Sequence, residues 1–440
     1  MVFKAHAAEA PVTYTRFCAS CGISDIESFV SHSGQFIVHS AVIRGFVPRA
    51  TGTNALKYIT AEPQLIALMG ERVSRGLSQE LQVPMQYRDK VHATVFNWAP
   101  VGQAIGLITQ VHSDGFLYKM IVPGQVEGPM LFKGVLQALI LEFANRDHNR
   151  SGELPNWVVE GMVRQIQTTA IPTYIVNKKP ITIETAGYDR LGNTRAYFQT
   201  NTPLTLQDFS FANLNKVTPE QRQQFEASSH LLVHQLLKLK NGPQLFAKFL
   251  QTLPTTLNWQ TAFYSVYKQH FTGPLQFEKW WMLNWVQFKN SQDRELWSLD
   301  VTLDRLESVL YTTMEVRAET NSIPLYRDTS LQEFIQIADF TMQREILSQK
   351  VQHMSFMSLN VPEKAVKLWN GYIQVLDSYL QRRGNDTQPT LKSEPGQRLQ
   401  SLLKSTLKTL NELDAARAEL KVGGQPVIPT EEPENRQASR

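Results

Sequence analysis

The chain contains very little cysteine: the only two cysteines among 440 residues form the sequence Cys18-Ala-Ser-Cys21. Two cysteines exclude a four-cysteine zinc site. A thioredoxin-like redox site would need the pair at the start of a helix within a βαβ unit, and here the pair stands in a short, irregular N-terminal segment. We expect a local disulfide in an oxidising compartment, with two ordinary thiols as the second interpretation.

Long apolar runs are also missing. The nearest candidate, Met130 to Ala144, is shorter than the roughly 18 apolar residues that span a bilayer, and it contains Lys133, Gln137 and Glu142. This pattern predicts a buried helix of a soluble core, so no transmembrane segment is expected. Ala5 to Ala7 resemble the end of a signal peptide without the apolar segment that precedes a cleavage site, and the alternative is an alanine-rich disordered start.

The chain has no large excess of either charge, since 44 Lys and Arg stand against 40 Asp and Glu, for a net charge of +4. These residues are spread along the sequence. No block of Lys and Arg marks a surface for nucleic acid or anionic lipid, so nucleic acid is not expected as a partner. The hydrophobic fraction of 42% is ordinary for a soluble globular protein, and the length allows two or three domains.

Two kinds of pattern divide the sequence. Alternating and β-branched residues predict strands at 35–43, 92–97, 104–111 and 116–122, with a helix over 62–82 that Thr60 could cap. From about residue 129 the apolar spacing is helical, apart from an extended excursion at 171–185, and it stays helical after 290. The predicted fold class is therefore α+β.

These patterns predict five segments. They are an irregular N-terminal segment with the CxxC pair (1–34), a β-rich α/β subdomain (35–128), a helical subdomain (129–290), an additional all-α C-terminal region (300–422) and a disordered tail (423–440). Thr218, Pro219 and Gln221 form a capping box at the start of a helix that should end near Asn241-Gly242. Leucines three or four apart on one face of 396–421 fit either a packed bundle or a partner-binding surface.

The most informative segment is 135–161, an apolar helix followed by a polar loop and the phrase Pro155-Asn156-Trp157-Val158-Val159-Glu160-Gly161. It resembles the active-site helix pair of gluzincin zinc metallopeptidases, within the peptidase MA-like group. There the first helix carries HExxH and the second begins with Pro-x-Trp-Leu-x-Glu-Gly. The two histidines bind zinc, the first glutamate is the general base, and the second glutamate is the third ligand. The resemblance covers roughly residues 35 to 290.

The family's spacing identifies the corresponding residues here. With the common spacing of 18 residues before Glu160, the five-residue window is Gln137 to Leu141. Gln137 and Leu141 then stand at the two histidine positions and Ala138 at the catalytic glutamate, so only Glu160 keeps its family identity. One carboxylate and one carboxamide are poor ligands for zinc. We expect no metal, no cofactor and no peptide hydrolysis at this site.

The resemblance therefore implies a catalytically inactive, metallopeptidase-like protein, a pseudopeptidase. Its remnant cleft could bind peptide or protein by strand addition at a sheet edge. The family also implies export to the periplasm or the extracellular space, which the alanine-rich start and the CxxC pair support. A scaffold that acts through its C-terminal helices is an alternative, and the sequence indicates no oligomeric state.

Simpler interpretations exist for the candidate residues. A glutamate in the first turns of a helix is favoured by the helix dipole, so Glu160 does not require a metal. His230 and His234 lie four apart on a predicted helix, with Glu226 four residues earlier, and they could hold a metal in a hydrolase that uses a different site. Two partly buried histidines on an amphipathic helix are the commoner explanation of that pair.

Overall fold

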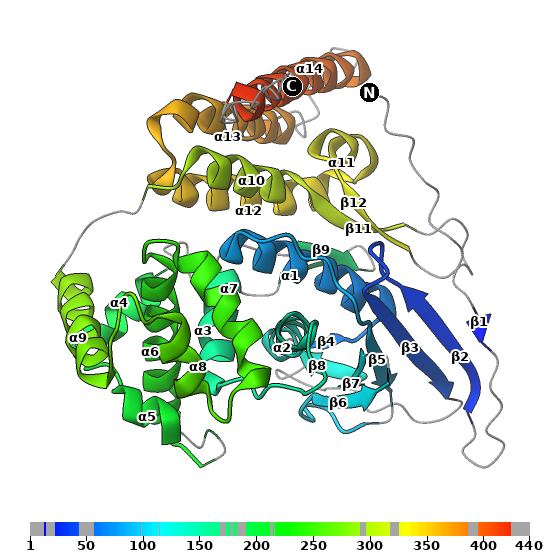
Figure 1. Cartoon of the computed structure of the whole chain (residues 1–440). Coiled ribbons are helices and arrows are strands. Elements are labelled where there is room, and N and C mark those ends of the chain that lie inside the picture. The colour runs from blue at the N-terminus through cyan, green and yellow to red at the C-terminus, as the bar shows by residue number, and fades with distance from the viewer. Residues whose placement is uncertain are drawn as a thin grey trace, which may run out of the picture. The chain divides into compact units, whose positions relative to one another are not determined.

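The computed structural model describes residues 13–14, 23–43, 57–97, 99–113, 115–167, 173–176, 179–182, 191–211, 214, 216–290, 296–316, 325–385 and 395–423. The fold class is α+β, as predicted (Figure 1). The chain divides into two compact units, of which the first comprises Met1–Asp293 with Thr312–Thr329, and the second Arg294–Tyr311 with Ser330–Arg440. Cys18, Cys21 and the predicted tail after residue 423 lie outside the described residues.

A mixed sheet of six strands forms the centre of the first unit, in the order β1-β2-β3-β5-β7-β6. Its strands are β1 (Thr13–Tyr14), β2 (Ile23–Val30), β3 (Phe36–Ile43), β5 (Val91–Phe96), β6 (Gly106–His112) and β7 (Gly115–Pro123). β3, β5 and β7 run parallel, whereas β6 is antiparallel to β7 and β2 is antiparallel to β3. The predicted strands at 35–43, 92–97, 104–111 and 116–122 are thereby confirmed within a few residues.

Helices α1 (Pro63–Leu81) and α2 (Gly128–Asn145) pack against this sheet. The apolar residues that recur every four positions along α1, from Leu65 to Leu81, are buried because they face the sheet and α2. The predicted cap was wrong: the N-cap residue is Glu62. Thr60 belongs instead to the short strand β4 (Tyr58–Thr60), which pairs with β8 (Gln125–Glu127) just before α2.

The remaining helices of the first unit follow α2 in the chain. They are α3 (Asn156–Gln167), α4 (Gly192–Phe198), α5 (Leu206–Phe211), α6 (Pro219–Leu237), α7 (Gly242–Thr252), α8 (Trp259–Val266) and α9 (Pro274–Asn290). The predicted capping box on α6 is confirmed, since the Thr218 N–H donates to Gln221 Oε1 (3.0 Å) and the Gln221 N–H donates to Thr218 Oγ1 (3.3 Å). Asn241 adopts the left-handed conformation (φ +58°) and turns the chain from α6 into α7.

Two predictions made from local pattern were wrong. The segment 1–34 is not irregular throughout, because Ile23–Val30 forms β2 along β3; its acidic residues interrupt the alternation that marks a strand. The region after 290 is not helical throughout either, because β11 (Thr312–Val316) and β12 (Leu325–Thr329) form a hairpin. β11 pairs with β9 (Thr173–Val176), which pairs with β10 (Lys179–Thr182) in the predicted extended excursion. β11 therefore has a partner far away in the sequence, which a local pattern does not show.

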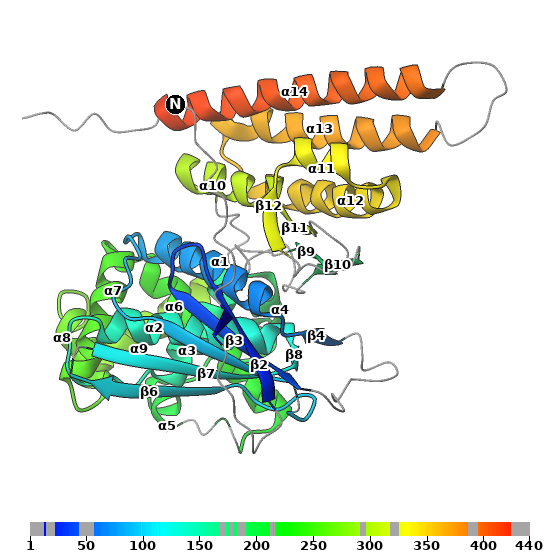
Figure 2. The same cartoon turned by 90° about the vertical axis from the view of Figure 1, so that its right-hand side faces the viewer.

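The second unit consists of packed helices (Figure 2). They are α10 (Leu299–Leu310), α11 (Leu331–Ile337), α12 (Phe340–Met357), α13 (Glu363–Asn385) and α14 (Pro395–Gly423). The buried Trp369 on α13 donates its indole N–H to the carbonyl of Met354 on α12 (2.8 Å). Tyr372 donates to Asp414 Oδ1 on α14 (2.6 Å), and Leu410 of the predicted leucine face is fully buried beside α13.

No helix in the described part of the chain combines the length and the apolar character that crossing a membrane requires.

Candidate functional site

The window predicted to be the lost zinc motif lies in the middle of α2. This helix packs against β7 on one side and against α3 and α7 on others, which explains why its sequence is apolar at nearly every position. Ala138 is fully buried, Leu141 is buried and Gln137 is half-buried. The window therefore presents two apolar residues and one carboxamide where the family has three zinc-site side chains.

The Trp and Gly of the second motif helix both have a packing role. Trp157 is fully buried, and its ring lies 5.6–6.3 Å from four other rings. They belong to Phe209, Phe246, Phe249 and Trp259. This cluster anchors the start of α3 through the large apolar area of its members.

Gly161 lies where α3 crosses α6 at close range. A Cβ at this position would stand 2.4 Å from Cγ2 of Val233 and 2.5 Å from the carbonyl oxygen of Ser229, both on α6. These distances are shorter than any ordinary carbon contact, so only glycine fits without a shift of one helix. The glycine of the motif thus sets the spacing between the two helices.

Glu160 pairs with a lysine from the neighbouring helix. Its side chain is 8% exposed, and its Oε1 accepts a hydrogen bond from Nζ of Lys133 on α2. Lys133 precedes Gln137 by four residues, which places it one helical turn away along α2. A positive charge of the protein itself therefore faces the carboxylate of the predicted motif. The sequence shows Lys133 only as a charge inside an apolar run. Its spacing of four residues from Gln137 was the signal that could have placed it beside the predicted site.

The second candidate pair, His230 and His234, is buried on α6, with 2% and 3% of each residue exposed. Nδ1 of His230 lies 2.8 Å from Oγ1 of Thr194 on α4. Glu226, four residues before His230, forms an ion pair with Arg164 of α3. Within the described residues, no group of three or more His, Cys, Asp or Glu side chains is placed to hold a metal ion.

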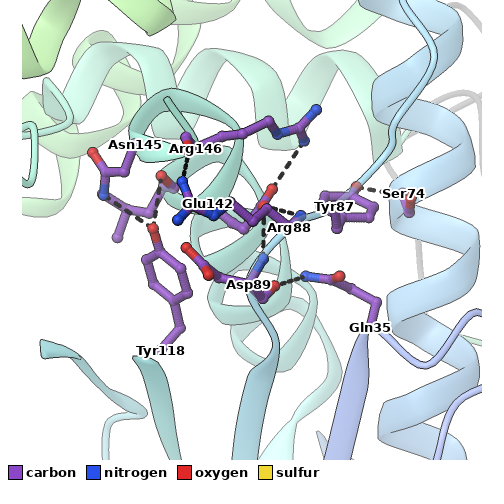
Figure 3. A network of polar contacts seen from close by, with 10 residues as sticks. Gln35, Ser74, Tyr87, Arg88, Asp89, Tyr118, Glu142, Asn145 and Arg146 are labelled. Atoms are coloured by element: carbon purple, nitrogen blue, oxygen red, sulfur yellow. Dashed lines mark hydrogen bonds and ion pairs between the residues drawn. The ribbon is translucent and has the colours of Figure 1, made fainter. Parts of the chain in front are cut away.

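A polar network at the end of α2 surrounds the fully buried Glu142 (Figure 3). Arg146 donates to its Oε2 (3.0 Å), and the backbone N–H groups of Arg88 and Asp89 donate to its Oε1 (2.8 and 3.3 Å). Burial raises the pKa of Glu142 above its ordinary value, while Arg146 and the hydrogen bonds oppose that change. The carboxylate thereby ties α2 to the segment that leads into β5.

Neighbouring contacts extend this network across the end of the sheet. Asn145 donates to the hydroxyl of Tyr118 (3.2 Å) and accepts from the Gly152 N–H (2.8 Å). Asp89 Oδ2 accepts the N–H of Phe116 (3.0 Å), and Gln35 donates to the Asp89 carbonyl (2.9 Å). These polar groups form hydrogen bonds with one another. A structural role, the connection of α2 to the strands and to the loop after α2, is therefore enough to explain the network.

Strand β6 forms one edge of the large sheet, since among the described strands its only neighbour is β7. Two of its apolar side chains are exposed, Ile108 at 45% and Val111 at 60%. The residue before the strand, Ile105, touches α2: a Cβ added at Gly134 would lie 3.1 Å from its Cγ2. The sheet edge therefore lies close to α2, the helix that carries residues 137–141.

No protein-family model, curated protein or solved structure matches this chain. The resemblance to the gluzincins thus stays a prediction that depends on the residues described above.

Proposed function

We propose that this protein is a catalytically inactive relative of the gluzincin peptidases that binds extended peptide along strand β6. The observation that carries the proposal is the antiparallel edge strand beside α2, with apolar side chains exposed on it. Unpaired backbone groups at a sheet edge can bind an extended segment of another chain. Export from the cytoplasm belongs to the same proposal, because the family resemblance implies it.

The side chains at the remnant window support the inactive part of the proposal. A zinc peptidase needs imidazole ligands and a carboxylate base beside the metal-bound water. Ala138 and Leu141 offer neither donor nor acceptor in their side chains, and Glu160 already has Lys133 as its partner. Hydrolysis by the family's mechanism would have no ligand set and no general base here.

The side chains of β6 support the binding part. Leu107, Thr109 and Val111 share the face of the buried Met120, Tyr118 and Phe116 on β7, whereas Ile108 lies on the opposite face with Lys119. A peptide strand on this edge would gain main-chain hydrogen bonds and would cover part of Ile108 and Val111. Each buried apolar side chain contributes about 25 cal/mol per Å² of covered apolar surface.

The test uses a fluorescein-labelled pool of random decapeptides and fluorescence anisotropy. We expect saturable binding to the full chain, weakened at least tenfold by Ile108→Lys combined with Val111→Lys, because charges on an edge oppose strand addition. Val30→Lys is the matched control: Val30 has the same 45% exposure as Ile108 and lies on β2, which is separated from β6 by three strands of the sheet. Absence of saturable binding, or equal loss in the control, would refute the proposal.

A further inference from the structure

Two histidines that the proposed function does not use meet on the sheet, on adjacent parallel strands β3 and β5. Nε2 of His39 lies 3.3 Å from Nδ1 of His92. The planes of the two rings differ by 20°, and the ring centroids are 5.6 Å apart. Both side chains are half-buried, on the face of the sheet opposite to the buried Phe36, Val38, Val91 and Ala93. The nitrogens therefore face each other at a site that solvent can reach.

The separation of these nitrogens suits a shared metal ion. Histidine nitrogens bind Zn²⁺ at about 2.0–2.1 Å, and two ligands at a tetrahedral angle are then about 3.3–3.4 Å apart. We propose that His39 and His92 form a two-histidine site for a divalent transition-metal ion, with water completing the coordination. Imidazole ligands suit copper and zinc, and Cu²⁺ should bind more tightly than Zn²⁺ because affinity follows the Irving–Williams order.

Ser28 on β2 provides an outer partner for one of the two ligands. Its Oγ lies 2.8 Å from Nδ1 of His39. When His39 donates its proton from Nδ1 to this hydroxyl, its Nε2 carries a free lone pair directed towards His92. A hydrogen bond of this kind fixes the tautomer and the ring orientation of metal-binding histidines.

Metal binding requires one imidazole proton to move, and no further reactant is needed for this step. In the metal-free protein, the proton on His92 Nδ1 can form the hydrogen bond to His39 Nε2. Metal binding moves that proton to His92 Nε2 through solvent, so that both facing nitrogens carry lone pairs. Burial lowers the pKa of both histidines, and His39, Lys90 and Lys119 lower that of His92 further; this direction favours the neutral rings that bind a metal ion.

Positive charges near the two histidines limit the affinity of the site for a metal ion. Lys119 on β7 is the direct cross-strand neighbour of His92, and Lys90 precedes the strand that carries His92. Two ammonium groups oppose the approach of a cation. The described residues also place no carboxylate or thiol with this pair in a ligand group. We therefore expect binding in the micromolar range, tighter when Lys119 is replaced by Met.

The experiment titrates the tag-free full chain with Cu²⁺, and then with Zn²⁺, by isothermal calorimetry at pH 7. We expect one Cu²⁺ site, weakened at least tenfold by His39→Gln and by His92→Gln, with coupling to two nitrogens in the electron paramagnetic resonance spectrum. His112→Gln removes an exposed histidine of β6 and should leave binding unchanged. Circular dichroism of each variant separates loss of the site from loss of the fold.

Two results would overturn the proposal. One is the absence of a saturable site in a folded chain, which would make the pair a hydrogen-bonded histidine pair only. The other is binding that both single variants leave unchanged. The proposal is independent of peptide binding at β6, so either one can fail while the other stands.

Discussion

The ion pair between Lys133 and Glu160 allows a quantitative test of how the buried Glu160 carboxylate is stabilised. The perturbation is Lys133→Met, which keeps the length and apolar stem of the side chain and removes the ammonium. Unit charges about 4 Å apart interact by about 4 kcal/mol at an effective dielectric constant of about 20. Lys133 is 36% exposed while Glu160 is 8% exposed, so solvent reduces this figure, and we take about 2 kcal/mol as the expected loss of stability.

The loss should depend on the presence of Glu160, because the cost comes from leaving a buried carboxylate without its cation. Glu160→Gln in the Lys133→Met background should therefore restore part of the stability. The coupling energy of the double-mutant cycle should be about 1–2 kcal/mol. The assay is urea unfolding at pH 7, followed by circular dichroism, for the natural chain, both single variants and the double variant.

Lys248→Met is the matched control, because Lys248 is an exposed lysine on α7 of the same unit. It should change the free energy of unfolding by less than about 0.5 kcal/mol. A loss of the same small size for Lys133→Met, or a coupling energy near zero, would refute the reasoning. Glu160 would then be stabilised by something other than the lysine, such as its place in the first turns of α3.

Three further predictions follow from the packing and the charges. Gly161→Ala should destabilise the first unit by about 2–3 kcal/mol in urea unfolding because its Cβ would meet α6, whereas Gly273→Ala, with nothing within 4 Å, should have little effect. Burial, with a smaller effect of Lys350, lowers the pKa of His353 to about 4 from 6.5, so the unfolded chain binds the proton more tightly. The contribution of His353 to stability should fall by about 2 kcal/mol from pH 7 to pH 5, and His353→Gln should make the pH dependence of stability shallower by that amount; an unchanged pH profile in this variant would contradict the assignment. Zinc content after dialysis against trace zinc tests whether Lys133 blocks a metal site at residues 137–141, in a His39→Gln background that removes the other proposed site. The chain should hold no zinc in this background, and it should bind about one zinc only when Lys133→Met is combined with Gln137→His, Ala138→Glu and Leu141→His. Zinc uptake by the three window substitutions without Lys133→Met would show that Lys133 does not block the site.

Local signals were sufficient to predict most helices. The period-four apolar residues of α1 and the capping box at Thr218 and Gln221 involve residues no more than four apart. Such patterns are decided within one or two helical turns, so they can be read without knowledge of the rest of the chain. The same holds for the motif that suggested the family, because its residues stand at fixed spacings on two consecutive helices.

The strands that were missed were hidden from the local pattern for two different reasons. β2 carries acidic residues that hide its alternation, although its partner β3 is the next strand in the chain. β11 pairs with β9, and helices α4 to α10 lie between these two strands in the sequence. A strand of five residues has little intrinsic preference, and its hydrogen bonds come from its neighbours. Tertiary pairing therefore decided these elements against the local pattern.

The candidate sites show the same division. The sequence by itself determined that the window at 137–141 lacks both histidines and the glutamate of the peptidase motif, because that statement concerns only which residues are present. Only the tertiary structure brought Lys133 to Glu160, and His39 to His92, since each pair joins two separate elements. The reason is physical: which side chains are present is written in the chain, but the distance between charges or ligands is set by how helices and strands pack.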